Sequence, residues 1–453
     1  MTRLNVEKKM KLKELQDWYE EYDKKFPKWY QKRRLLARKI YEEYERKGLP
    51  VGNYGMDFDL TEFNPYIAPP HKPLRKYQDL DNTGKERVQT VGQRPDEEER
   101  IGSHLQHDTS QTYLGFTELA KQSLFMKHPE GLVITNMDDA ICKYSWLEKF
   151  VNRIVPINLD KYTAWNSAYS IGGVFVRVKK GVVVDWPIQA CFYLEKVKLG
   201  QLVRIMVIAE PYSKVHLITG CAMAPLCRTA LHGCVSEVYV GRGAEVTFSF
   251  IHNFKPEFHI RPKIGVIVEE DATYRENYIL TSPVKSTQLY PTVILRGRNS
   301  RASIRSLIFG LGSSDIDVGS AIIYTAENTR GEIMARSVVA GKSIVKLRGS
   351  LKAYRANARG HLECRALLLS DKARAYAYPN LRSFSSEAEL THEAAVGKIA
   401  DKQLYYLMSR GLSKEEATSM IARGFLDTDI PGLPVLLQGE ISKLISMTAK
   451  EVM

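Results

Sequence analysis

Hydrophobic and polar residues alternate in short runs between about Gly172 and Pro379, and most runs end at Gly, Asn or Asp. A period of two is typical of strands that bury one face, whereas the 3.6-residue period of helices is almost absent from this segment. Small residues follow polar corner positions at separations of 28, 30, 29 and 27 residues, namely at Ala244, Ala272, Ala302, Gly331 and Ala358. A repeat of this length predicts a solenoid.

A single coil of such a repeat cannot bury its own inner face. Stacked coils can, because each strand then pairs with the strands above and below it at a spacing of about 4.8 Å. We therefore predict a mostly β protein with a right-handed parallel β-helix as its core. A large antiparallel sandwich is the alternative that the alternation leaves open.

The flanking sequence has a different pattern on each side of this core. Charged residues and aromatic residues at near-helical spacing predict an N-terminal helical arm that packs on its own protein or on a partner. Six of the 19 prolines lie between Pro50 and Pro95, which is typical of a linker. We predict five parts in chain order. They are a helical arm (1–48), a proline-rich linker that leads into the N-terminal region (49–130), a small α/β unit (131–171), the β-helix core (172–385) and a C-terminal helical domain (386–453).

Helical periodicity returns at the C-terminus. Ser413 and Glu416 have the spacing of a capping box, in which the hydroxyl and the carboxylate each accept a backbone N–H of the other residue. Gly411 is expected to end the helix before this box and Gly424 the helix after it. Apolar residues at helical spacing in 437–445 predict a third helix.

Composition and charge narrow the class of protein. Of the 453 residues, 44% are hydrophobic and 26% are charged, which is typical of a folded soluble protein. The sequence has no apolar stretch long enough for a spanning helix and no secretion signal at Met1, so we expect a cytoplasmic protein without a membrane partner. The net charge of +13 permits an acidic protein, an anionic lipid or a nucleic acid as partner without choosing among them.

Candidate chemistry centres on one of the six cysteines. Period-two alternation places Cys364 on the same face as Leu362 and Ala366, where an isolated cysteine is most often a small core residue. His392 and Glu393 follow 28 and 29 residues later, close to the repeat length, and are expected one coil away. A thiolate, an imidazole and a carboxylate that converge in this way would suit iron and its sulfide-bridged clusters.

The sequence resembles the SufB/SufD family of iron–sulfur cluster assembly proteins over roughly residues 130–453. The resemblance is strongest in the C-terminal part, and its motifs are "GCAMAP" (220–225), "LHGCVSEVYVGRGAEV" (231–246), "HLECRALLLSDKARAYAYPNL" (361–381) and "LTHEAAVGKIADKQLYYLMSRGLSKEEATSMIARGFL" (390–426). It implies a right-handed β-helix with helical ends that acts as a scaffold for a nascent, transiently held cluster.

The resemblance also implies roles for individual residues. Cys364 matches the proposed cluster or sulfur-acceptor cysteine of SufB-type members, and His392 and Glu393 match further ligands expected at a subunit interface. Cys221 is similar to the cysteine that is proposed to receive sulfur. The chain departs from many SufB sequences at His252 and Phe254, where those sequences carry Gln and Trp.

The same resemblance implies partners. These are a SufC-like ABC ATPase bound through the C-terminal helices, a second copy of this chain or a SufB/SufD paralogue, and a cysteine desulfurase or other sulfur donor. The chain has no phosphate-binding loop, so it is expected not to be an enzyme, and ATP hydrolysis is assigned to the ATPase. A reduced flavin is a further cofactor of this chemistry for which the sequence offers no support.

Two other functions are open at this stage. Because the chain has both Cys364 and His392, it is similar to SufB or to a single SufB/SufD protein that pairs with itself. A SufD-like structural subunit without its own cluster is the first alternative. A basic β-helix that binds nucleic acid is the second, and nucleic acid is not the expected partner.

Overall fold

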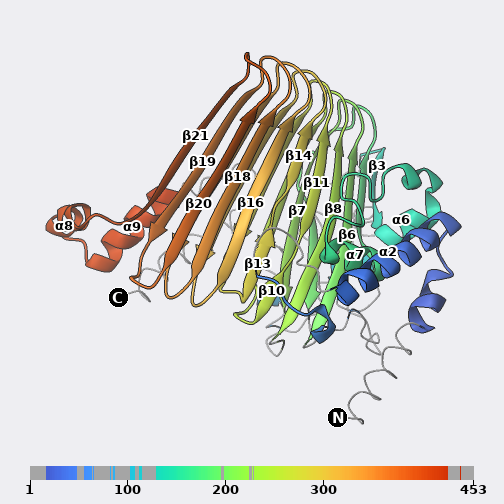
Figure 1. Cartoon of the computed structure of the whole chain (residues 1–453), viewed down its shortest axis with the longest axis horizontal. Helices are drawn as coiled ribbons and strands as arrows, with labels where there is room; N and C mark the ends of the chain where they lie inside the picture. The colour runs from blue at the N-terminus through green and yellow to red at the C-terminus, as the bar shows by residue number, and fades with distance from the viewer. Residues whose placement is uncertain are drawn as a thin grey trace, which may run out of the picture.

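The computed structural model describes residues 17–47, 56–63, 65, 82, 85–86, 103–107, 112–114, 129–194, 198–223, 227, 229–426 and 439. Two long sheets face each other and form a β-solenoid of about 7 turns, with helices near both ends of the chain (Figure 1). The predicted β-helix core with flanking helices is therefore confirmed, and the antiparallel sandwich is excluded, because consecutive coils pair in parallel.

One face of the solenoid is a ten-stranded sheet. In spatial order its strands are β2 (Thr112–Leu114), β1 (Ser103–His107), β5 (Ile188–Leu194), β7 (Lys214–Met223), β9 (Glu245–His252), β12 (Thr273–Leu280), β15 (Arg301–Gly310), β17 (Arg330–Val339), β19 (Arg359–Leu368) and β21 (Glu389–Lys398). All neighbours pair in parallel except β1 and β2.

The other face is an eleven-stranded sheet. It contains β3 (Leu132–Asn136), β4 (Gly173–Val178), β6 (Leu199–Ala209), β8 (Ala230–Val240), β10 (Phe258–Ile260), β11 (Lys263–Val268), β13 (Ser286–Leu289), β14 (Thr292–Leu295), β16 (Asp315–Tyr324), β18 (Ile344–Ala353) and β20 (Arg374–Ser383). Only the β3–β4 pair of this sheet is antiparallel in the described part of the chain.

The sequence repeat corresponds to a column of corners. Asp271, Asn299, Asn328 and Asn357 are 28 or 29 residues apart and all have φ between 56° and 59°. Asn and Asp tolerate this left-handed conformation better than most residues, because their short polar side chains bond to nearby backbone. The repeat length is thus set by one turn conformation recurring in every coil.

The predicted phase of the repeat is wrong at two of its five positions. The pairing of Arg301 with Arg330 places Ser300 and Thr329 directly after the corners, so Ala302 and Gly331 lie two residues too far along the strands. Ser300 and Thr329 are fully buried, and their hydroxyls donate to the carbonyls of Gly297 and Ala326 at 2.6 and 3.1 Å. The residue after the corner is therefore not restricted to alanine or glycine.

In the strands from β3 to β19, alternate side chains face the space between the two sheets. They form one continuous apolar cluster along the solenoid, from Leu132 and Val174 at one end to Leu362 and Ala366 near the other. Each coil contributes only a few side chains to this cluster, so its stability depends on its neighbours.

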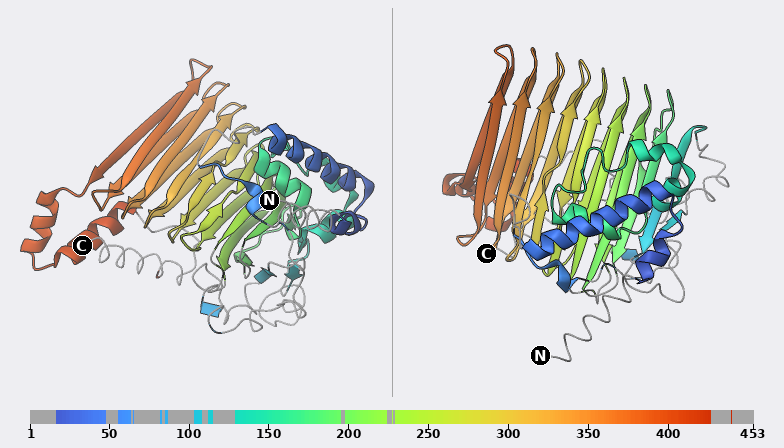
Figure 2. Two further views of the ribbon diagram at one scale, coloured as in Figure 1. Left: turned by 60° about the horizontal axis from the view of Figure 1, so that its bottom comes forward. Right: turned by 45° about the vertical axis from the view of Figure 1, so that its right-hand side comes forward.

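The N-terminal helices lie against the eleven-stranded sheet (Figure 2). They include α2 (Lys28–Lys47), η1 (Leu60–Glu62), α6 (Met137–Lys143), η3 (Ser145–Lys149) and α7 (Lys161–Tyr169). Arg34 of α2 is fully buried and donates to Asp23 Oδ1 at 2.6 Å and to the carbonyl of Ser170 at 2.8 Å. Of the two predicted possibilities, packing on its own protein or on a partner, the described part of the helical arm shows the first.

The C-terminal helices are α8 (Asp401–Ser409) and α9 (Lys414–Leu426). The predicted capping box is present: Glu416 N–H donates to Ser413 Oγ at 3.2 Å and Ser413 N–H donates to Glu416 Oε2 at 2.8 Å. Gly411, with φ of +93°, lies just after α8 as predicted. Gly424 does not end α9, because the buried Leu426 anchors a further half-turn of helix.

Two boundaries of the predicted organisation differ from the strands. β21 pairs with β19 along its whole length, so the sheet continues past the predicted end of the core at residue 385. β1 lies within the predicted linker and pairs with β5. Apart from Gly439, which is helical, the predicted third C-terminal helix at 437–445 lies outside the described residues. Among the described helices, none combines the length and the apolar character that crossing a membrane requires.

Candidate functional site

Cys364 lies in the middle of β19 with its side chain inside the solenoid. It is fully buried between Leu362 and Ala366, and its neighbours on the adjoining strands are Ala335 and Ala394. Burial raises the pKa of the Cys364 thiol to about 12, and the nearby Glu363 carboxylate adds to the rise. In this chain alone the thiol is therefore protonated at neutral pH.

His392 lies on the next coil, as predicted. It pairs with Leu362 across the β19–β21 ladder, so it is on the same face as Cys364 and diagonally adjacent to it. His392 is exposed, and β21 is the last strand of its sheet within the described residues. The imidazole therefore lies at the open end of the solenoid, one coil beyond the buried thiol.

Glu393 does not join this pair. It follows His392 in an extended strand, so its side chain points to the opposite face of the sheet, where Arg365 donates to its carboxylate at 2.6 Å. The predicted convergence of all three side chains is therefore not present in a single chain. Adjacent residues of a strand cannot both face the interior.

Glu393 belongs instead to a row of ion pairs on the outer face. Glu363, nearly buried, lies 3.3 Å from Arg365 Nε and accepts from Arg336 Nε at 2.7 Å. Arg336 also donates to the carbonyl of Phe425 in α9 at 3.4 Å. This row, which we call the charge row (Arg336, Glu363, Arg365, Glu393), connects the C-terminal helix to the two strands that hold Cys364 and His392.

Cys221 is in the interior as well, but far from Cys364. Five strand-to-strand steps separate β7 from β19, which at about 4.8 Å a step corresponds to roughly 24 Å along the solenoid. The interior positions between them hold side chains that include Tyr278, Leu280 and Ile308. The candidate sulfur-entry cysteine and the candidate cluster cysteine thus belong to two separate sites.

Two histidines that the sequence analysis did not assign surround Cys221. Its Sγ lies 3.5 Å from His232 Nε2, and the ligand atoms of Cys221, His232 and His252 all lie within 4.8 Å of one another. Burial lowers the pKa of His232 to about 3 and lowers that of His252 well below its usual range, so both rings are neutral. His252 follows Cys221 by one coil, 31 residues, and this spacing was the available signal; His232 comes from the other sheet.

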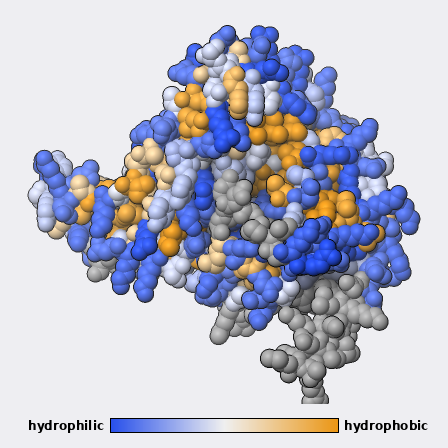
Figure 3. All heavy atoms as spheres, viewed as in Figure 1, coloured by the Kyte–Doolittle hydropathy of each residue, from blue (hydrophilic) through white to orange (hydrophobic). Residues whose placement is uncertain are grey.

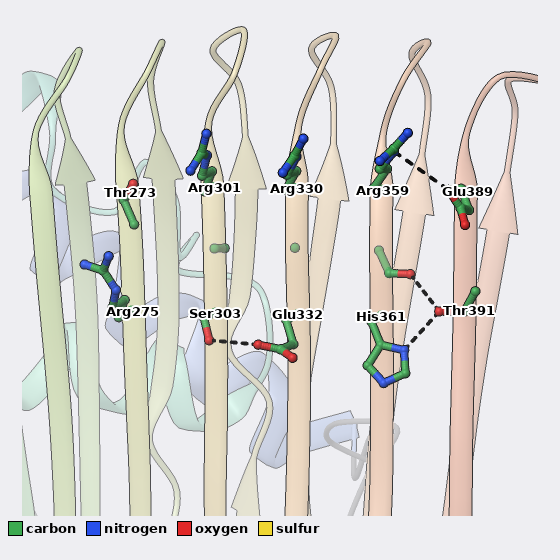
Figure 4. Close-up of a pocket in the computed structure, with 13 residues that line it drawn as sticks. Thr273, Arg275, Arg301, Ser303, Arg330, Glu332, Arg359, His361, Glu389 and Thr391 are labelled. Atoms are coloured by element: carbon green, nitrogen blue, oxygen red, sulfur yellow. Dashed lines mark hydrogen bonds and ion pairs between the residues drawn. The ribbon is translucent and has the colours of Figure 1, made fainter. Parts of the chain in front are cut away.

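A shallow groove lies on the outer face of the ten-stranded sheet, away from both cysteines. Arg301, Arg330 and Arg359 are stacked along it at the same position of successive strands (Figure 4). Glu332 and Glu389 lie among them, with Glu389 3.7 Å from Arg359. Four arginines and two glutamates line the groove, so its net charge is positive, but basic charge alone does not distinguish a nucleic acid from any other acidic partner.

Comparison with known proteins identifies the family. The family model described as "SUF system FeS cluster assembly, SufBD core domain" matches residues 192–425. A protein of Methanothermobacter thermautotrophicus strain Delta H, named "Iron-sulfur cluster assembly SufBD family protein", is 39% identical over 421 residues, which cover 92% of this chain and 99% of that protein. A similarly named protein of Archaeoglobus fulgidus is 36% identical over 82% of this chain and 96% of its own length. Another, from Staphylococcus aureus strain MRSA252, is 28% identical over 92% of this chain and 89% of its own length. The chain belongs to the SufBD family of iron–sulfur cluster assembly proteins.

Proposed function

We propose that this protein is a SufB-like scaffold that holds a nascent iron–sulfur cluster, as cargo, at the open end of its solenoid. The observation that carries the proposal is the placement of Cys364 and His392 on one face of neighbouring strands, at the last coil of the described sheet. A thiolate and an imidazole are both ligands of iron in sulfide-bridged clusters. Cys364 is the cluster or sulfur-acceptor residue and His392 the second ligand.

Two features of the last coil support contact with another subunit there. Among the described strands β20 pairs only with β18 and β21 only with β19, so each has a free edge with unpaired backbone groups. Tyr376, Tyr378 and Val396 on these two strands are more than 40% exposed although they are large and apolar. A free, partly apolar strand edge favours pairing with another chain.

We propose that the partner at this edge is a second copy of this chain, with a SufB/SufD paralogue as the alternative. A two-fold axis at the edge brings like residues together, so two copies supply two thiolates and two imidazoles around one position. Sets of four Cys and His ligands hold two-iron clusters in proteins. Glu393 reaches this edge from the outer face, and it becomes available to a cluster when it gives up Arg365.

The C-terminal helices are the proposed docking site of a SufC-like ABC ATPase. Tyr405, Tyr406 and Met408 of α8 and Met420 of α9 have between 38% and 68% of their surface exposed. Apolar side chains interrupt the polar surface where α9 meets the last coils, toward the left of Figure 3. The charge row joins α9 to the strands of Cys364 and His392, which gives a bound ATPase a mechanical connection to the cluster site.

Cys221 keeps its proposed role as the entry point for sulfur from a cysteine desulfurase or other donor. Its side chain is only 2% exposed, so transfer from a donor protein requires the solenoid to open around β7. The roughly 24 Å to Cys364 then requires a route through the interior or along the surface.

Anaerobic co-expression with the candidate ATPase tests the proposal. Iron, acid-labile sulfide and visible absorption are measured on the purified complex of wild type, Cys364→Ala and the control Cys234→Ala, which removes another buried cysteine far from β19. We expect iron and sulfide in wild type and in the control, and their loss from Cys364→Ala. Full retention of the cluster in Cys364→Ala contradicts the scaffold assignment. Complexes that all lack a cluster yet bind the ATPase favour the SufD-like alternative.

A further inference from the structure

A second candidate site lies inside the N-terminal half of the solenoid, independent of the cluster edge. Cys221 is near the end of β7, His252 is the last residue of β9 and pairs with Cys221, and His232 reaches the same point from β8 in the opposite sheet. All three side chains are buried. One thiol and two imidazoles from three strands of both sheets therefore face one interior position.

The spacing of these groups fits a metal ion. In a tetrahedral zinc site with bonds of 2.0 to 2.3 Å, neighbouring ligand atoms are about 3.5 Å apart. Cys221 Sγ and His232 Nε2 are 3.5 Å apart, and the whole set lies within 4.8 Å. A small inward movement of the third ligand is enough to complete a three-ligand site with one open position.

The groups behind the histidines hold the rings in the orientation that a ligand needs. His232 Nδ1 lies 2.8 Å from Gln201 Oε1, and because a carbonyl oxygen only accepts, Nδ1 carries the proton and the Nε2 lone pair faces Cys221. The hydroxyl of Tyr278 lies 3.3 Å from His252 Nδ1. Such outer-shell hydrogen bonds are a regular feature of histidine ligands to metals.

The other side chains around Cys221, His232 and His252 are mainly apolar. Leu280 and Ile308 occupy the same interior column on the next two coils, and Phe254 packs against both histidine rings at centroid distances of 5.7 and 5.6 Å.

We propose that Cys221, His232 and His252 bind a zinc ion inside the solenoid. One sulfur and two nitrogen ligands suit a borderline-soft divalent transition metal and exclude magnesium and calcium as preferred ions. Binding releases one proton, because the Cys221 thiol becomes a zinc-bound thiolate. A filled site thereby withholds Cys221 from sulfur transfer, so zinc and sulfur compete for the same thiol.

Cobalt titration of the chelator-treated, full-length protein tests this proposal. Cobalt(II) takes tetrahedral zinc sites and gives an intense charge-transfer band only when a thiolate is a ligand. We expect one equivalent of cobalt to produce this band and one equivalent of zinc to remove it. Absence of the band in wild type overturns the proposal.

Variants assign the site to these residues. We expect Cys221→Ser to abolish the charge-transfer band. His252→Gln is close in size, so it should keep the circular dichroism spectrum of wild type while weakening cobalt binding at least tenfold. Gln201→Ala should weaken cobalt binding by about 10- to 100-fold, because it removes the hydrogen bond that orients the His232 ring. Cys364→Ala and Cys234→Ser bind cobalt as wild type does. Unchanged cobalt binding in Cys221→Ser and His252→Gln overturns the proposal. The sulfide assay on Cys364→Ala tests the iron–sulfur scaffold proposal separately, so failure of one proposal can be told from failure of the other.

Discussion

Glu276 is a carboxylic acid that faces the interior of the solenoid. Its side chain is fully buried on β12, and the hydroxyl of Tyr274 donates to its Oε2 at 2.7 Å. Burial raises the pKa of Glu276 to about 7, with the Tyr274 hydrogen bond opposing part of the rise. The protonated form is therefore favoured in the folded protein at mildly acidic pH.

This raised pKa makes stability depend on pH. Between the unfolded pKa near 4.5 and the folded pKa near 7, the folded state binds more protons at Glu276 than the unfolded state does. Protonation of Glu276 therefore adds to the free energy of unfolding in full below pH 4.5, and this stabilisation is lost as the pH rises through 7. The loss is about 3 kcal/mol. Glu276→Gln removes the titration, so the variant should gain thermal stability relative to wild type on going from pH 5 to pH 8. A difference between the two melting temperatures that is the same at both pH values contradicts this reading.

The protonated thiol of Cys364 leads to a prediction about reactivity. With a pKa of about 12, Cys364 is almost entirely protonated at pH 8, and it is buried, whereas Cys142 is exposed. We expect iodoacetamide to modify Cys142 at least tenfold faster than Cys364 in the protein without a cluster, measured by peptide mass spectrometry. Equal rates would mean that the last coil opens readily and exposes an activated Cys364 thiol on the coil before it.

The solenoid coils are the elements whose form the sequence predicts best. The repeat follows from one left-handed corner per coil, and the polar corner residue at Asn328 and Asn357 is visible in the sequence. The candidate pair of Cys364 and His392 is predictable from the same repeat. Residues of β19 and β21 that pair are 30 residues apart, and a spacing of 28 keeps His392 on the same face as Cys364, diagonally adjacent to it. The approach of His232 to Cys221 is not predictable in this way, because it depends on the register between two sheets. The position of Glu393 follows from the same alternation, which places neighbouring residues of β21 on opposite faces of the sheet.

The left-handed corner can be tested at Asn328. Its φ of 57° strains most side chains by about 1–2 kcal/mol, and glycine is exempt. Asn328→Ala should therefore lower the free energy of unfolding by about 1 kcal/mol, whereas Asn328→Gly should cost less. Thermal unfolding of the two variants in parallel measures the difference, and a more stable alanine variant would rule out the conformational explanation.

The contact between α9 and the solenoid depends on Arg336 of the charge row. Replacing Arg336 with Met keeps the aliphatic packing but removes the bond to Phe425 O and leaves the nearly buried Glu363 with Arg365 alone. We expect faster hydrogen exchange in α9, weaker binding of the ATPase, and a loss of stability of about 3 kcal/mol. Arg348→Met is the matched control, because Arg348 pairs with Asp317 at 2.5 Å on the other sheet. Equal exchange in α9 for both variants would show that Arg336 does not anchor the helix.

At the scale of the whole molecule, the two ends of the solenoid differ. Helices such as α7 pack against the eleven-stranded sheet in the N-terminal half, whereas the last coil has two free strand edges within the described part of the chain. The zinc-site candidates lie in the first half and the cluster candidates at the open end, five steps apart. Because each coil of a solenoid interacts mainly with its neighbours, this separation would allow the buried half to stay stable while the proposed cluster site at the open end loads and releases a cluster.

The open end should therefore be where two copies of the chain meet. Val396 is 44% exposed on β21, and Val183 is 47% exposed near the other end of the solenoid. Val396→Glu places a charge on the proposed interface and should raise the dimer dissociation constant at least tenfold, because an uncompensated charge must be desolvated there. Val183→Glu changes the same residue type at similar exposure and should leave the dimer intact. Light scattering coupled to size-exclusion chromatography measures the oligomeric state of all three proteins. A monomeric wild type would contradict the proposed dimer, and a dimer that survives Val396→Glu would place the interface away from β21. In either case Cys364 and His392 would lack the second pair of ligands on which the proposed cluster site depends.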